Sequence, residues 1–102
     1  MKKTVLITGT SSGLGKATAR LFANNGWNVV ATMRRPELEQ DLVRLNDVLV
    51  ARLDVQDRAT IAEAIEIGIA HFGPIDALIN NAGFGLYGPF EVTPREKGSG
   101  AV

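Results

Sequence analysis

The feature that most constrains the fold is a glycine-rich turn near the amino terminus. It consists of Thr8, Gly9, Thr10, Ser11, Ser12, Gly13, Leu14 and Gly15. The apolar, mostly β-branched residues 4–7 before it are typical of a buried parallel strand. Apolar and small residues then recur at helical spacing: Leu14, Ala17, Thr18, Leu21 and Phe22. Because a turn from strand to helix aims backbone N–H groups and the positive end of a helix dipole at one point, the sequence predicts a phosphate-binding site.

Each glycine of this turn has a predicted role. Gly9 permits a tight exit from the strand, Gly13 leaves room where a pyrophosphate would approach, and Gly15 lets the helix pack closely against the sheet. The spacing differs from the G-x-G-x-x-G fingerprint of dinucleotide sites, because three residues separate the first two glycines and one separates the last two. A loop that serves only as a turn is the alternative.

The rest of the chain alternates short apolar strands with helical patterns. Strands are predicted at residues 4–7, 28–33, 48–53 and 75–79. Helices are predicted after the glycine turn, over a short stretch beginning at Pro36 whose apolar stripe is Leu38, Leu42 and Leu45, and after Asp57, which can cap the last one. The buried face of this last helix is predicted to be Ile61, Ala64, Ile65, Ile69 and Phe72. Gly68 within it should weaken the helix by roughly 1 kcal/mol relative to alanine.

This alternation predicts an α/β fold with a parallel sheet and helices on both faces. Right-handed crossovers place the first two helices on one face and the third on the other, which gives the strand order 3-2-1-4. The glycine turn and the residues Asn80, Asn81, Ala82 and Gly83 then meet at one carboxyl edge of the sheet, where ligands bind in open sheets of this kind.

Two further sites at this edge carry polar side chains. The amides of Asn80 and Asn81 can fix the backbone on one side and contact a ligand on the other, with a plain turn as the alternative. Asp54, which precedes Val55 at the end of the third strand, could accept a hydrogen bond from an adenine amine. It could equally cap the turn that follows.

Arg34 and Arg35 follow the second strand, where an NAD site usually places an Asp or Glu for the ribose 2′-hydroxyl. No carboxylate stands there. A guanidinium group is always charged and binds phosphate in a bidentate manner, so we expect NADP(H) rather than NAD(H) as the cofactor. The alternative is that both arginines are solvated loop charges.

Composition argues against several other functions. Eleven basic and eleven acidic residues balance, so the chain has no electrostatic footprint for nucleic acid or an anionic membrane. The sequence has no cysteine, and its one histidine, His71, has no partner at metal-ligand spacing, so we expect no metal site. No apolar run approaches the ~20 residues of a membrane span, which favours a soluble, cytoplasmic protein.

Together the motifs resemble those of the short-chain dehydrogenase/reductase (SDR) family. The glycine turn is similar to its T-G-x-x-x-G-x-G motif, Asp54-Val55 to its adenine-side dipeptide, and residues 80–83 to its N-N-A-G motif. The resemblance covers residues 1 to about 97. It implies a Rossmann fold, a nicotinamide cofactor held by these motifs, and hydride transfer between alcohols and carbonyls. In NADP-preferring members a basic residue occupies the place of Arg34.

The residues that the family uses for proton transfer, a Ser and a Tyr-x-x-x-Lys, are missing from this sequence. Its only tyrosine, Tyr87, is followed four positions later by Glu91, and its serines, Ser11, Ser12 and Ser99, fit no catalytic position by motif. We therefore assign no catalytic residue and leave open whether this chain is itself an enzyme.

The carboxyl-terminal residues depart from the family pattern. Thr93 and Pro94 are typical of a helix start, but the linker-like sequence 98–100 follows within a turn. We interpret 1–97 as a partial dinucleotide-binding domain and 98–102 as a flexible tail that reflects a truncation, a shifted reading frame or an appended scar. A short frayed helix with a natural tail is the alternative.

These observations favour the cofactor-binding portion of an NADP(H)-dependent short-chain oxidoreductase that cannot catalyse alone. The alternatives are a non-catalytic nucleotide-binding or sensing module and an interaction fragment that uses an exposed strand edge. Since the strand at 75–79 would present such an apolar edge, we expect self-association. A small alcohol or carbonyl substrate is expected only for a longer form.

Overall fold

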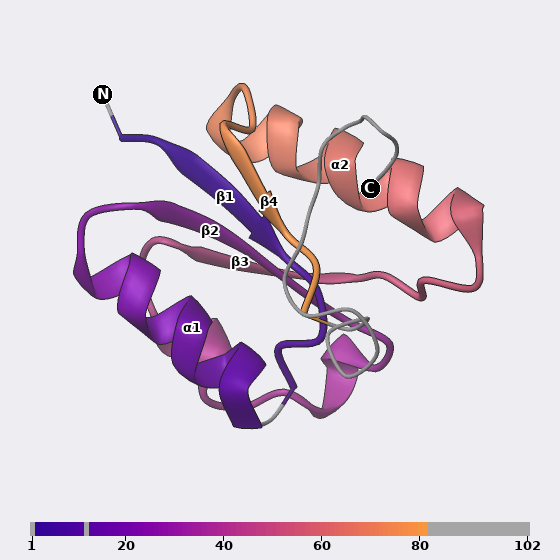
Figure 1. The fold of residues 1–102 in the computed structure, drawn as a ribbon, viewed down its shortest axis with the longest axis horizontal. Coiled ribbons are helices and arrows are strands. Elements are labelled where there is room, and N and C mark those ends of the chain that lie inside the picture. The colour runs from indigo at the N-terminus through magenta and orange to yellow at the C-terminus, as the bar shows by residue number, and fades with distance from the viewer. Residues whose placement is uncertain (1, 12, 82–102) are drawn as a thin grey trace.

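The computed structural model describes residues 2–11 and 13–81. Four parallel strands form one sheet: β1 (Thr4–Ile7), β2 (Asn28–Met33), β3 (Val48–Arg52) and β4 (Ala77–Ile79). Their order, β3-β2-β1-β4, confirms the order predicted from the alternation of strands and helices. Figure 1 shows helix α1 (Gly13–Asn24) on one face of the sheet and helix α2 (Arg58–Phe72) on the other.

Every residue of β1 is buried, because the strand lies between β2 and β4 and is covered on both faces. Its side chains alternate between two apolar cores. Val5 and Ile7 belong to the core beneath α1, whereas Leu6 packs in the core beneath α2. The loop that follows β1 therefore starts from a strand that is paired on both edges and buried on both faces.

The buried residues of α1 are not the apolar residues whose spacing predicted the helix. Leu14 and Leu21 are 59% and 60% exposed, while the positions that pack inward are Gly15 and Ala19, with Phe22 partly buried. Small residues lie against the sheet because the helix approaches it closely. The apolar spacing therefore predicted the helix but not which of its residues pack against the sheet.

The predicted single helix after Pro36 is wrong. Two separate 3₁₀ turns stand in its place: η1 (Pro36–Leu38) and η2 (Leu42–Arg44). The backbone of Glu39 is extended between them, with φ −79° and ψ 131°. Leu42 is fully buried in the core beneath α1, whereas Leu38 is 67% exposed, so the predicted apolar stripe does not form.

Helix α2 begins and ends as predicted, but its buried face is smaller. The Asp57 carboxylate caps it by accepting a hydrogen bond from the Ala59 N–H at 3.1 Å. The inward residues are Thr60, Ala64 and Gly68, with Ile61 and Phe72 partly buried; Ile65 and Ile69 are exposed instead. Gly68 is required for packing, because a Cβ there would lie 2.9 Å from a methyl group of Val30.

Several sequence predictions fall outside the described residues. These concern Ser12, Ala82, Gly83, Tyr87, the helix start at Thr93 and the tail 98–102. The fourth strand is shorter than the predicted 75–79, since only Ala77–Ile79 form it. The amide of Asp76 nevertheless donates to the Thr4 carbonyl at 2.8 Å, so β4 is aligned with β1 from before its first residue.

Candidate functional site

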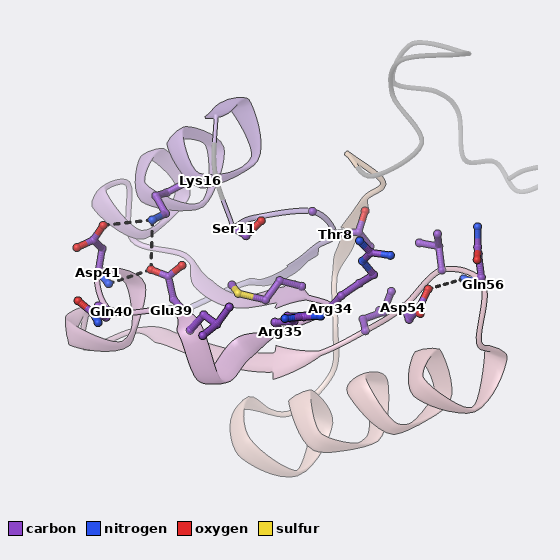
Figure 2. A pocket seen from close by; sticks show the side chains of 15 residues that line it. Thr8, Ser11, Lys16, Arg34, Arg35, Glu39, Gln40, Asp41, Asp54 and Gln56 are labelled. Atoms are coloured by element: carbon purple, nitrogen blue, oxygen red, sulfur yellow. Dashed lines mark hydrogen bonds and ion pairs between the residues drawn. The ribbon is translucent and has the colours of Figure 1, made fainter.

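A cleft of about 660 Å³ opens at the carboxyl ends of β1, β2 and β3. Six of the predicted site residues line it: Gly9, Ser11, Arg34, Arg35, Asp54 and Val55. Thr8, the first residue of the glycine turn, lines it as well, and the remaining lining residues were not predicted: Lys16, Met33, Leu38, Glu39, Gln40, Asp41, Leu53 and Gln56. Figure 2 shows the loop after β1 along one side of the cleft and the segment after β2 along the other.

The loop between β1 and α1 is anchored to β2 through Thr10. Thr10 is fully buried, and its N–H and its hydroxyl both donate to the Thr32 carbonyl at 3.1 Å. Thr32 in turn donates from its hydroxyl to the Ile7 carbonyl at 2.8 Å. Thr10 does not line the cleft and has a structural role. It fixes the loop whose neighbours, Gly9 and Ser11, do line it.

Gly13 and Gly15 both stand where a side chain would be unfavourable, for different reasons. Gly13 has φ +59°, a left-handed conformation that disfavours side chains, and a Cβ there would find open space within 4 Å. At Gly15 a Cβ would lie 1.9 Å from the Gly9 carbonyl oxygen and 2.7 Å from the Asn81 side-chain nitrogen. Gly15 therefore packs closely against the loop after β1 and against Asn81, whereas the sequence predicted close packing against the sheet.

The two asparagines that follow β4 form hydrogen bonds with the loop between β1 and α1. The Asn81 amide donates to the Gly9 carbonyl at 3.0 Å, and the Asn80 side-chain oxygen accepts from the Thr8 hydroxyl at 2.9 Å. Asn81 thus fixes the backbone of the loop as predicted, whereas the bond of Asn80 is to a side chain. Neither asparagine lines the cleft; instead they join the end of β4 to the loop that does.

Arg34 and Arg35 are exposed side chains on the cleft wall that follows β2. Neither forms an ion pair with a carboxylate of residues 2–11 or 13–81. Figure 2 places both between the Lys16 end of the cleft and the Asp54 end. Two cations without protein counter-charges in the described chain favour an anionic ligand group at the middle of the cleft.

Asp54 caps the turn that follows β3, which is the alternative role that the sequence predicted for it. One carboxylate oxygen accepts from the Gln56 N–H at 3.0 Å, and the Asp54 carbonyl accepts from the Thr60 hydroxyl at 3.0 Å. These bonds tie the end of β3 to the first turn of α2. Because Asp54 also lines the cleft, its second carboxylate oxygen can accept from a ligand.

A charged cluster that the sequence did not reveal closes the other end of the cleft. The Lys16 ammonium, on α1, lies 3.4 Å from a Glu39 carboxylate oxygen and 3.2 Å from one of Asp41. Arg20 adds a longer contact of 3.6 Å to Asp41. These residues are distant in the sequence, and no motif pairs them, so only the fold brings them together.

The electrostatics of this cluster are mutually stabilising. The hydrogen bond to Asp41, together with the nearby Glu39 carboxylate, raises the pKa of Lys16 above its ordinary value. Burial alone would raise the pKa of Glu39, but hydrogen bonds from the backbone amides of Leu42 and Asp41, with the Lys16 charge, hold it below its ordinary value. The hydrogen bond from Lys16 likewise lowers the pKa of Asp41. All three groups are therefore charged at neutral pH.

His71 does not line the cleft. It is in the last turn of α2, where its ring packs edge-on against Phe72 with the centroids 4.6 Å apart. Across residues 2–11 and 13–81, no group of acidic or histidine side chains is arranged to hold a metal ion. A search of the same residues finds no helix of the length and apolarity needed to cross a bilayer.

A parallel sheet in the order β3-β2-β1-β4, with a glycine turn opening a helix at the switch between β1 and β4, defines the Rossmann class of α/β proteins. The family model described as short chain dehydrogenase matches residues 3–99, and the chain belongs to this family. The resemblance carried by the three motifs is thereby confirmed.

Curated relatives match most of this chain. It is 41% identical over 88 residues to an uncharacterized oxidoreductase of Schizosaccharomyces pombe, which covers 86% of this chain and 30% of the relative. It is 45% identical over 84 residues to an NADP-dependent 3-hydroxy acid dehydrogenase of Salmonella typhi, covering 80% of this chain and 34% of the relative. The chain thus spans about a third of the length of these relatives.

Solved structures show the same fold. A short-chain dehydrogenase from Streptomyces avermitilis superposes with a TM-score of 0.71 at 36% identity, over 79% of this chain and 31% of that protein. A 3-ketoacyl-(acyl-carrier-protein) reductase from Brucella melitensis, complexed with NADH, gives a TM-score of 0.66 at 31% identity, over 74% of this chain and 32% of that protein.

Proposed function

We propose that this chain is the NADP(H)-binding portion of a short-chain oxidoreductase. The observation that carries the NADP(H) preference is the pair Arg34 and Arg35 on the cleft wall, without carboxylate partners among the described residues. A ribose 2′-phosphate is the group of the cofactor that such a pair would bind. A ribose 2′-hydroxyl would instead be bound by an acceptor carboxylate, and no Asp or Glu stands at the end of β2.

The rest of the cleft fits a dinucleotide. The first turn of α1 contains no acidic side chain, and its amides carry the positive end of the helix dipole. The space around Gly13 leaves room for a pyrophosphate against these amides. Asp54 lines the cleft, and its carboxylate would accept a hydrogen bond from an adenine amine. We therefore assign cofactor binding to residues 9–15, 34–35, 54–55 and 80–83, with Thr10, Asn80 and Asn81 acting through the loop.

The nicotinamide, when bound, would accept or donate the hydride that converts an alcohol to a carbonyl or the reverse. This chain's own residues would bind and orient the cofactor. The names of the relatives support a nicotinamide cofactor but not one choice, since one is NADP-dependent and another is a complex with NADH. The substrate of the whole protein, an alcohol or carbonyl compound, is part of the proposal. Family membership favours this function over a sensing module.

The experiment that tests the cofactor preference is calorimetric titration of the chain with NADPH and with NADH. We expect the parent chain to bind NADPH more tightly. Arg34→Glu should weaken NADPH binding by about tenfold or more, because a hydrogen bond to a charged group contributes about 1.5–3 kcal/mol. It should leave NADH binding nearly unchanged, since NADH has no 2′-phosphate.

Arg58→Glu is the matched control. It makes the same charge change at an exposed position at the start of α2, outside the cleft lining. It should leave the ratio of the two affinities unchanged. Equal affinities of the parent for NADPH and NADH would contradict the assignment of Arg34 and Arg35 to a phosphate.

Two other expectations from the sequence stay proposals. We propose self-association through the edge of β4, because Leu78 on this strand is 51% exposed and no described strand pairs with its outer edge. We also propose a cytoplasmic location.

A further inference from the structure

The cleft wall that carries Arg34 and Arg35 is linked by ion pairs to helix α1 through Glu39 and Asp41, and of these two only the Glu39 side chain is buried. This side chain is only 2% exposed. One of its carboxylate oxygens accepts from the backbone N–H of Asp41 at 2.9 Å and of Leu42 at 2.8 Å. The same oxygen lies 3.4 Å from the Lys16 ammonium of α1.

Glu39 also joins the two 3₁₀ turns of the wall. Its backbone N–H donates to the Pro36 carbonyl at 3.1 Å and closes η1. Its carboxylate satisfies the amides at the start of η2, whose Leu42 is fully buried. Within η1, the Leu38 N–H donates to the Arg35 carbonyl at 3.1 Å. The position of Arg35 is therefore connected, through one short turn, to the position of Glu39.

The charges of the cleft divide into two groups. Lys16 is engaged by Glu39 and Asp41, whereas Arg34 and Arg35 have no carboxylate partner within the described chain. Figure 2 shows the Lys16 contacts gathered at one end, beside Glu39 and Asp41, with the arginines farther along the cleft. Lys16 is thus already neutralised by protein groups, although it lines the same cleft.

We propose that the Lys16–Glu39 pair is a positioning device that holds the arginine-bearing wall against α1 and so sets the preference for a 2′-phosphate. Glu39 and Lys16 are positioning residues that act through Arg34 and Arg35 without contacting the phosphate. This inference rests on the proposed NADP(H) function. It adds that specificity depends on a contact between α1 and the segment after β2.

The competing explanation makes a prediction of opposite sign. If Lys16 were itself a phosphate ligand, Glu39 would compete with the phosphate for its charge. Glu39→Gln would then release Lys16 and strengthen binding of the 2′-phosphate. If the pair positions the wall, the same substitution weakens that binding, because the glutamine can still accept from the two amides but no longer attracts Lys16.

The test uses two fragments of the cofactor, adenosine 2′,5′-bisphosphate and adenosine 5′-monophosphate, which differ by the 2′-phosphate. The ratio of their dissociation constants is measured by calorimetry for the full 102-residue chain. The variants are Lys16→Met, Glu39→Gln, their double mutant, and Lys16→Arg, which keeps the positive charge. Asp47→Asn is the control, since it removes a carboxylate paired with Lys2 before β3, outside the cleft lining.

We expect Lys16→Met and Glu39→Gln each to reduce the preference for the bisphosphate by roughly three- to tenfold, a size typical of coupled neighbours. The double mutant should lose no more than Lys16→Met alone, because Lys16→Met already removes the contact that Glu39→Gln weakens. Lys16→Arg and Asp47→Asn should retain the parent ratio. An increased preference in Glu39→Gln, or unchanged ratios in both single variants, would overturn the inference.

Hydrogen exchange of the Leu38 amide gives a readout that needs no nucleotide. If the pair positions the wall, exchange at Leu38 accelerates in Lys16→Met and Glu39→Gln but not in Asp47→Asn. An unchanged rate in Lys16→Met would overturn the positioning role even if the nucleotide ratios moved. A parent chain that binds both fragments equally would contradict the NADP(H) proposal, and the Leu38 rates would still decide whether the pair positions the wall.

Discussion

At the scale of single residues, the site depends on how tightly the loop after β1 closes on itself. The Gly9 carbonyl is the meeting point: Asn81 donates to it at 3.0 Å, and the missing side chain of Gly15 leaves it room. The geometry of the turn therefore depends on a contact with the segment after β4, which is far away in the sequence. The glycine turn and the asparagines after β4 are therefore joined by hydrogen bonds.

We expect Gly15→Ala to destabilise the chain and to impair nucleotide binding together. Its Cβ would meet the Gly9 carbonyl at 1.9 Å, so the loop must move, and overpacking of this kind typically costs about 1–3 kcal/mol. Urea denaturation gives the free energy of unfolding, and calorimetry gives the affinity for NADPH.

Gly26→Ala is the control for this substitution. Gly26 has φ +85°, so alanine is strained there, but its Cβ would meet no atom within 4 Å. This variant should lose stability, by about 1–2 kcal/mol, without weakening NADPH binding beyond what unfolding explains. Parent-like stability and affinity in Gly15→Ala would show that the loop does not need this close contact.

At the scale of elements, the sequence predicted the strands and α2 because their signals are local. Asp57 caps α2, and the apolar runs at 4–7 and 28–33 form buried strands. The segment from Pro36 to Leu45 was mispredicted because its leucine spacing suits a helix while a tertiary contact decides otherwise. Glu39 turns inward to Lys16, and its extended backbone separates two 3₁₀ turns.

The difference between local signals and tertiary contacts also explains which residues of the candidate site could be predicted. Motifs located Gly9, Ser11, Arg34 and Asp54 on the cleft, because each follows a strand whose end the topology fixes. No pattern could locate Lys16 and Glu39, since their pairing depends on the distance between α1 and the segment after β2. The exposed Ile65 and Ile69 of α2 show the converse, because apolar spacing alone cannot say which face is covered.

The edge strand β4 carries a prediction of its own. Leu78→Lys should reduce self-association, because a charge on an exposed edge strand opposes pairing with another strand. Sedimentation velocity over a range of protein concentrations measures this. Leu21→Lys, which makes the same change at a 60% exposed position on α1, should leave self-association intact. A parent chain that is monomeric at every concentration, or equal effects of both variants, would contradict association through β4.

At the scale of the whole molecule, the described chain is a parallel sheet whose candidate cofactor site lies at one edge. Its order β3-β2-β1-β4 gathers the loop after β1, the arginines after β2 and Asp54 after β3 around a single cleft of about 660 Å³. The chain spans about a third of its curated relatives, so catalysis by the whole protein is a proposal that rests on family membership.

The most direct test of the account is an NMR titration of the ¹⁵N-labelled chain with NADPH. We predict that the amide signals of Gly9, Ser11, Gly13 and Arg34 shift together in a saturable manner, while the indole signal of Trp27, which packs against Phe22 at the opposite end of the sheet, stays in place. Saturable binding that leaves the amides of the glycine turn unshifted would contradict the central claim that this turn holds the phosphates.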